Sequence, residues 1–483
     1  MIRRLAGCIR QYKLPAILAP LIILCESAME VLIPTLMANL IDYGVEMGDM
    51  NYVLITACKL LICALISLSC GFGAAYYAAK ASTGFGANLR HDIFYRVQDF
   101  SFANIDKFST SSLVTRLTTD VNNVQMAFMM IIRGAFRSPA LIIFSVIMAA
   151  RISPKMCLVY LAAIPVLGIT IYFLMSRTHP IMEKVFKTYD KLNNVVAENL
   201  HGIRVVKSFV REEHEKEKFN GVSDEIYSGF VRGEKRIVMN MPIMMAVIFA
   251  SMMVISWIGA KAIIASGNNP AIGMTTGQLM SMFTYTIQIL SSLMMLSMIF
   301  MMIIISRASM ERVDEILREV PDIANPETAK KEVPDGSVRF EQVSFCYSQK
   351  AERNALSNID LDIRSGETIG IIGGTGSSKS SLVQLIPRLY DATEGRVLVG
   401  GHDVREYDLE TLRDAVAMVL QKNVLFSGTI AENLRWGNPD ATDEDLVRVC
   451  RLAQADSFIQ TFPDKYETYI EQGGTNVSGG QKQ

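Results

Sequence analysis

The sequence predicts two folds in one chain, an all-helical membrane domain of six spans followed by a mixed α/β domain. Half of the 483 residues are hydrophobic and the mean hydropathy is positive, which is more apolar than a soluble protein of this length normally is. Six apolar stretches are each about 20 residues or longer, enough to cross roughly 30 Å of hydrocarbon. They centre near Leu24, Ile66, Ile142, Ile164, Val247 and Leu293.

A change of composition predicts where the membrane domain ends. Residues 1–13 are expected to form an amino-terminal tail, and residues 14–306 the membrane domain with two long loops. Residues 307–337 form a charged linker that contains prolines. Residues 338–483 then have the alternating strand and helix patterns of a soluble α/β domain.

The distribution of charge predicts how the spans are oriented. The tail carries four basic residues and no acidic one, whereas the loop at residues 42–51 carries three acidic residues and no basic one. By the positive-inside rule the amino terminus is cytoplasmic, and six crossings of the plasma (inner) membrane return the α/β domain to that side. Residues 81–125 and 177–236 have apolar residues at helical spacing, so we expect them to continue the spans as cytoplasmic helices.

The composition also excludes several classes of function. A net charge of -1 provides no basic field for nucleic acid, so nucleic acid is not an expected partner. The eight cysteines include no CxxC pair and have no His-rich neighbours, so we expect reduced thiols rather than zinc ligands or disulfides. The basic start leads into a long apolar run without a small-residue cleavage site, which indicates a retained span rather than a signal peptide.

A glycine-rich turn carries the clearest chemical signal. We expect strands at residues 338–347 and 367–374, and the second leads into a loop followed by a helix. Successive amides of such a loop surround phosphate oxygens, the lysine Lys379 reaches the outer phosphates, and the hydroxyl of Ser380 binds magnesium. The expected ligands are therefore the phosphates of a bound molecule and Mg²⁺, and the resemblance given below implies that this molecule is ATP. The loop residues are Gly373, Gly374, Thr375, Gly376, Ser377, Ser378, Lys379, Ser380 and Ser381.

One position departs from the usual phosphate-loop pattern. A glycine normally precedes the lysine, and Ser378 stands there in this chain. Taken alone, the segment is also compatible with a Gly/Ser-rich turn that binds no ligand.

Three segments in order resemble those of ATP-binding-cassette exporters. GGTGSSKSSL is similar to the Walker A sequence, VLQKNVLFSGTIAENL to the Q-loop and GGTNVSGGQKQ to the signature sequence. The resemblance implies that Tyr347 stacks on adenine, and that Gln421 contacts magnesium at the catalytic site and links it to the membrane domain. It also implies that the signature holds the γ-phosphate bound to the opposite subunit. The signature residues are Ser478, Gly479, Gly480 and Gln481.

The membrane half resembles the same family, which implies the fold of a type I exporter. Residues 113–125 and 198–219 are similar to the cytoplasmic loops that carry the coupling helices of these exporters. Their periodicity alone favours a plainer interpretation, two amphipathic helices with solvated charged faces.

The resemblance also implies parts that this stretch does not contain. The Walker B aspartate, the catalytic glutamate, the D-loop and the switch histidine would follow Gln483. A phosphoryl-transfer site needs a group that orients the attacking water. We therefore expect a truncated form of a longer protein, which as it stands does not hydrolyse ATP.

Two features of the spans bear on the cargo. Glu26 and Glu30 lie one turn apart in the first span, and carboxylates in a membrane are costly enough to indicate function, such as binding a cation. Alternatively, Arg133 and Arg137 neutralise them in a packed interface. Spans five and six are rich in methionine, which suits either a permissive pocket for apolar ligands or ordinary helix packing.

The expected function is ATP-driven efflux of an amphipathic small molecule, drug or lipid by alternating access, as one half of a dimeric exporter. The alternatives are an ATP-gated channel or regulatory subunit, and a partner subunit that binds ATP without turning it over. We expect a heterodimer in which this chain's Walker site is the weaker one. Ser378, Glu471 and Gln472 depart from the family pattern, whereas the signature VSGGQ stays close to it. The alternative is a homodimer that tolerates the serine.

Overall fold

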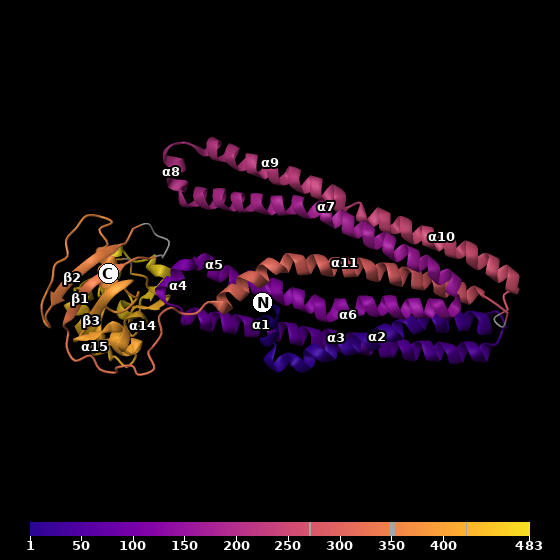
Figure 1. The fold of residues 1–483 in the computed structure, drawn as a ribbon, viewed down its shortest axis with the longest axis horizontal. Coiled ribbons are helices and arrows are strands. Elements are labelled where there is room, and N and C mark those ends of the chain that lie inside the picture. The colour runs from indigo at the N-terminus through magenta and orange to yellow at the C-terminus, as the bar shows by residue number, and fades with distance from the viewer. Residues whose placement is uncertain (270–271, 348–352, 422) are drawn as a thin grey trace. The chain divides into compact units, whose positions relative to one another are not determined.

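The computed structural model describes residues 1–269, 272–347, 353–421 and 423–483. The chain divides into two compact units (Figure 1). Unit 1 comprises Met1–Asp99 and Phe108–Glu319, and unit 2 comprises Phe100–Lys107 and Val320–Gln483.

In the described residues, unit 1 consists of helices and the turns between them. Its elements are α1 (Ile2–Gly7), η1 (Arg10–Tyr12), α2 (Lys13–Asn39), the π-helical η2 (Leu40–Val45), α3 (Met50–Gln98), α5 (Thr110–Thr115), the π-helical η3 (Arg116–Asp120), α6 (Val121–Ile152), α7 (Pro154–His201), α8 (Ile203–Ser208), α9 (Glu212–Ile237), α10 (Asn240–Ser266) and α11 (Thr276–Arg318). Six helical runs are long and apolar enough to cross a membrane, which confirms the six predicted spans. The helices α3, α7 and α9 continue well beyond their apolar parts, as predicted.

The helices of unit 1 form two groups (Figure 1). The helices α2, α3, α6 and α11 pack as a bundle, and α7, α9 and α10 form a long arm, of which α7 and α10 pack against α6 and α11. The core between α7 and α11 contains Tyr160 and Tyr285, both fully buried. The Tyr160 hydroxyl donates a hydrogen bond to the Met282 carbonyl oxygen at 2.9 Å, so the polar atom of this side chain is satisfied inside the apolar core.

Unit 2 has an antiparallel sheet in the order β2-β1-β3-β4. Its strands are β1 (Val338–Phe345), β2 (Leu356–Ile363), β3 (Glu394–Val399) and β4 (His402–Asp403), and a second pair is β5 (Gly428–Thr429) with β6 (Tyr469–Ile470). Phe340 of β1 pairs with Leu361 on one side and with Val397 on the other. Alternating side chains of β1 and β3 thereby meet Tyr407 and Leu412 in one apolar core.

Short helices surround these strands. They are α4 (Phe102–Lys107), α12 (Lys379–Gln384), η4 (Val404–Glu406), α13 (Leu409–Ala415), α14 (Ile430–Leu434), α15 (Asp443–Leu452), α16 (Asp456–Ile459), η5 (Lys465–Glu467), η6 (Gln472–Gly474) and α17 (Gly479–Lys482).

One of the two predicted strands is wrong. Residues 338–347 contain β1 as expected, but residues 367–374 are not in a strand. A strand needs a neighbour for its backbone N–H and C=O groups, and in the described part of the chain no strand pairs with this segment. Its isoleucines are accordingly not buried, with Ile372 98% exposed.

A buried carboxylate joins α2 to α11. Asp42, in the π-helical continuation of α2, is only 4% exposed. Its oxygens accept hydrogen bonds from the Gly277 backbone N–H at 2.8 Å and from the Thr275 hydroxyl. A Cβ at Gly277 would lie 2.5 Å from the Ala38 carbonyl oxygen, so only glycine permits this approach. The negative charge therefore sits at the positive end of the long helix α11.

We predict that Asp42→Ala destabilises unit 1 by about 2 kcal/mol, because it leaves the Gly277 N–H and the Thr275 hydroxyl without a buried acceptor. Asp42→Asn keeps the shape of the side chain but removes the charge, so its loss of stability should be smaller than that of Asp42→Ala. Thermal unfolding in detergent measures both. Asp224→Ala, at an exposed position of α9, is the control. Equal midpoints for Asp42→Ala and Asp224→Ala would contradict the role given to Asp42.

Candidate nucleotide-binding site

The predicted phosphate loop forms a tight turn before α12. Gly376 and Ser378 both have positive φ, at 83° and 60°. A Cβ at Gly373 would come within 2.6 Å of Ser377 Oγ, so the turn closes on itself at that point. The loop thus has the sharp curvature that brings successive amides toward a common centre.

The lysine of the loop lies over it. Lys379 Nζ donates to the carbonyl oxygens of Gly373 and Gly374 at 2.9 Å each, and it lies 3.2 Å from Ser377 Oγ. An ammonium held only by neutral acceptors would gain from exchanging them for phosphate oxygens. The geometry therefore places a cation at the centre of the turn.

The start of α12 is open to an anion. Ser378 occupies the position before the helix, but its side chain makes no capping hydrogen bond. Ser380, the second residue of α12, is exposed, and its hydroxyl has no hydrogen-bond partner among the described residues. Free backbone amides at a helix start and a free hydroxyl fit a phosphate with its Mg²⁺ ion.

Tyr347 lies beside the same helix. Its hydroxyl is 2.8 Å from Ser381 Oγ and also donates to Gln384 Oε1 at 3.3 Å. The side chain remains 51% exposed, so one ring face is accessible to a flat ligand. The structure therefore brings Tyr347 next to the phosphate loop, where the predicted adenine contact requires it.

The remaining predicted residues stand apart from the loop. Gln421 is exposed, and its neighbour Lys422 in the predicted Q-loop segment lies outside the described residues. Ser478 begins α17, where its Oγ accepts from the Gln481 backbone N–H at 3.3 Å and leaves its own proton free to donate. Across the described ranges, no hydrogen bond or ion pair joins Gln421 or residues 478–481 to the phosphate loop.

One contact of unit 2 has no signal in the sequence. Residues 113–125, which resemble a loop that carries a coupling helix, lie in unit 1, where Asp120 is fully buried against Ser309 and Arg312 of α11, and their coupling role stays a prediction. The short helix α4, which precedes them in the chain, belongs to unit 2, and its Asp106 accepts a hydrogen bond from the Tyr390 hydroxyl at 2.6 Å. Periodicity could not reveal this pairing, because the two residues are far apart in the sequence.

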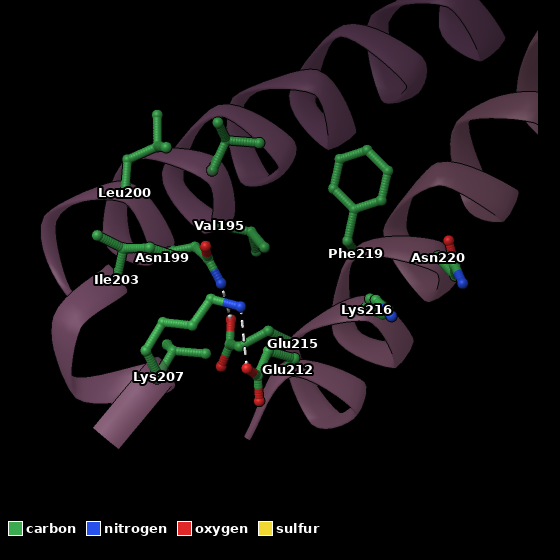
Figure 2. Close-up of a pocket in the computed structure, with 12 residues that line it drawn as sticks. Val195, Asn199, Leu200, Ile203, Lys207, Glu212, Glu215, Lys216, Phe219 and Asn220 are labelled. Atoms are coloured by element: carbon green, nitrogen blue, oxygen red, sulfur yellow. Dashed lines mark hydrogen bonds and ion pairs between the residues drawn. The ribbon is translucent and has the colours of Figure 1, made fainter. Parts of the chain in front are cut away.

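The second predicted segment contains a short helix as expected. α8 joins α7 to α9 at the end of the arm, and the three elements enclose a pocket with an apolar lining (Figure 2). A Lys207–Glu212 ion pair of 3.0 Å lies beside it. The largest exposed apolar side chains of this tip are Leu200, Val205, Phe209 and Val210.

The carboxylates of the first span are paired. Arg137 of α6 lies 3.2 Å from Glu26 Oε1 and 2.9 Å from Glu30 Oε2. Arg133 is exposed and forms no ion pair among the residues described. The contacts favour the packed interface over a free cation site, and of the two arginines considered only Arg137 makes it.

Six membrane-crossing helices and a phosphate loop in one chain define a membrane protein fused to a nucleotide-binding domain. The sequence model of the ABC transporter transmembrane region matches residues 16–294, and that of the ABC transporter domain matches residues 356–483. The chain belongs to the ABC transporter family, with the half-transporter arrangement of one membrane domain and one nucleotide-binding domain.

Similar proteins occur in several bacteria. The uncharacterized ABC transporter ATP-binding protein YfiB of Bacillus subtilis is 32% identical over 475 residues, which cover 98% of this chain and 82% of the relative. The uncharacterized ABC transporter ATP-binding protein Rv1273c of Mycobacterium tuberculosis is 33% identical over 482 residues, which cover 98% of this chain and 81% of the relative. The putative multidrug export ATP-binding/permease protein YgaD of Bacillus subtilis is 27% identical, and the match covers 100% of this chain and 83% of the relative.

We predict that Ser378→Gly tightens ATP binding severalfold, since a Cβ at positive φ costs about 1 kcal/mol. Ser378→Ala retains the Cβ and removes only the hydroxyl, so its affinity should stay near that of the wild type. ATP titration of this chain's own site compares the three proteins. If glycine and alanine gave the same affinity, the strain would not be the cause.

Proposed function

We propose that this chain is one half of an exporter that uses ATP to move an amphipathic small molecule, drug or lipid across the plasma (inner) membrane. The observation that carries the proposal is Lys379, held over a glycine-rich turn at the uncapped start of α12, in the same chain as six spans. The printed name of the relative YgaD, a putative multidrug export protein, supports the choice of cargo.

The roles of the site residues follow from their chemistry. The amides of residues 373–378 and Lys379 would hold the β- and γ-phosphates, while Tyr347 would stack on the base. Ser380 and Gln421 would contact a Mg²⁺ ion, which neutralises phosphate charge when bound. Ser478 and the amides that follow it would complete the site of a second subunit, because they make no contact with this chain's own loop in the described residues.

Two subunits are needed for such an arrangement, and we propose that they differ. Ser378 holds a strained backbone in this chain's loop, with φ of 60°. The turn at residues 478–481 is regular, with reciprocal hydrogen bonds between Ser478 and Gln481. A regular signature turn would serve a strong site on the partner, while the strained loop would form a weaker site here.

The proposed cycle is alternating access. Closure of two nucleotide-binding domains around ATP would move α4 and α8, and the helices continuous with them would carry this movement to the spans. The exposed apolar side chains at the α8 tip suit contact with a nucleotide-binding domain, because their exposure to water is unfavourable.

We predict that Lys379→Ala lowers the ATP affinity of this chain's own site by roughly tenfold or more, since a charge-assisted hydrogen bond contributes about 1.5–3 kcal/mol. Photolabelling of this chain with an ATP analogue, in the presence of its partner, measures the site directly. Lys331→Ala, at another exposed lysine, is the control. An unchanged affinity in Lys379→Ala would mean that the loop is only a turn.

We also predict the orientation of the membrane domain. In a background without the eight native cysteines, Met47→Cys should react with an impermeant thiol reagent in sealed cells, whereas Tyr227→Cys, in α9 and away from the α8 tip, should react only after permeabilisation. Both side chains are well exposed, at 63% and 70%, so access to the reagent depends on the side of the membrane. Labelling of Tyr227→Cys in sealed cells would reverse the proposed topology.

A further inference from the structure

Tyr390 occupies a central position in unit 2. It is 8% exposed, and its ring lies edge-on to that of Tyr347, with centroids 5.2 Å apart and an interplanar angle of 86°. Its ring also packs against those of Phe345 and of Phe102 in α4, with ring centroids 5.5 Å and 6.0 Å away. One side chain thus touches both the tyrosine next to the phosphate loop and the helix α4.

The polar end of Tyr390 holds α4 directly. Its hydroxyl donates to Asp106 Oδ2 at 2.6 Å, the length of a charge-assisted hydrogen bond. Burial, together with the nearby carboxylate of Asp106, raises the pKa of the Tyr390 hydroxyl, so it remains a donor throughout the physiological range.

Two further hydrogen bonds attach the beginning of α4 to the linker. Asn104 Nδ2 donates to the Val320 carbonyl oxygen at 3.3 Å, and the Ser101 hydroxyl donates to the Asp322 carboxylate. These contacts involve no part of the nucleotide site. Of the contacts described, those that Tyr390 makes with Asp106 and with the ring of Phe102 connect α4 to the side where a base would bind.

We propose that Tyr390 is a positioning residue that transmits occupancy of the base site to α4, through ring contact with Tyr347 and its hydrogen bond to Asp106. The inference rests on the proposed binding of ATP at this loop. It adds a route that depends on the base, beside the phosphate-dependent route expected for Gln421.

The contacts explain how the transmission would work. The Tyr347 hydroxyl is bonded to Ser381 and Gln384 of α12, so a base that stacks on its exposed face presses on a side chain already fixed at its far end. The ring of Tyr347 is also in edge contact with that of Tyr390, which shifts with it. α4 follows through Asp106, and peptide bonds connect α4 to α3 before it and to α5 after it.

Coupling of this kind is reciprocal, because a ligand that changes the state of α4 must itself be affected by that state. Removing only the Tyr390 hydroxyl should therefore separate the two ends of the route. The aromatic core stays filled and the ring contact with Phe102 remains, but the hydrogen bond to Asp106 is lost, so α4 responds more weakly to the base.

Hydrogen exchange of the complete transporter, with its partner and in lipid nanodiscs, tests the proposal. Two probes are compared, ATP with Mg²⁺ and inorganic tripolyphosphate with Mg²⁺, which lacks the base. Both should slow exchange at residues 373–381. Only ATP should slow exchange at residues 100–107, and we expect a severalfold effect there.

The variants make the result specific. Tyr390→Phe and Asp106→Asn should each markedly weaken the ATP effect at residues 100–107 and retain it at residues 373–381, and the double variant should add little. Tyr469→Phe, at an exposed tyrosine of β6, should behave as wild type. Asp106→Glu keeps the carboxylate and should restore part of the response.

Contrary outcomes are distinguishable. An equal response of α4 to tripolyphosphate, or an undiminished ATP response in both Tyr390→Phe and Asp106→Asn, would overturn the route through Tyr390 and leave ATP binding intact. No response of residues 373–381 to either probe would overturn the proposed function and this inference with it.

Discussion

The absence of water from the middle of a bilayer dictates most of unit 1. Every backbone N–H and C=O group there needs a partner within the protein, so spans are continuous helices and their ends need special provision. The join between α2 and α11 shows how one such end is stabilised, because Asp42 accepts a hydrogen bond from the Gly277 N–H in the first turn of α11. Pairing of Glu26 and Glu30 with Arg137 meets the same constraint for side chains.

Much of this architecture could be predicted from the sequence, since the signals are local. An uninterrupted apolar run indicates a span, and apolar residues spaced three and four positions apart indicate its helical continuation. The strand predicted at residues 367–374 is absent from the structure because strand formation depends on neighbours that no local pattern specifies. The coupling role of residues 113–125 stays a prediction, because it came from resemblance and their periodicity indicates only an amphipathic helix.

The chemistry of the site could be predicted from the sequence, whereas the contacts that connect its residues to α4 could not. Lys379 and Tyr347 were found from motif order, and the structure places both at the start of α12. Tyr390 was missed because its importance comes from two long-range contacts, a ring on one side and a carboxylate on the other. No spacing rule connects residue 106 to residue 390. Ser378 shows the opposite case, since a change of one residue type in a motif marked a position that the structure then shows at positive φ.

The tip of the arm has a consequence for how the chain behaves in a cell. Phe209 and Val210 are 74% and 80% exposed at the end of two long helices, and the described residues of unit 1 leave most of their surface uncovered. Quality-control proteases and chaperones act on species that expose apolar segments. If a nucleotide-binding domain of a second subunit covers the tip, as we propose, an unassembled copy would be degraded faster than an assembled one. The abundance of this chain would then follow the supply of that subunit.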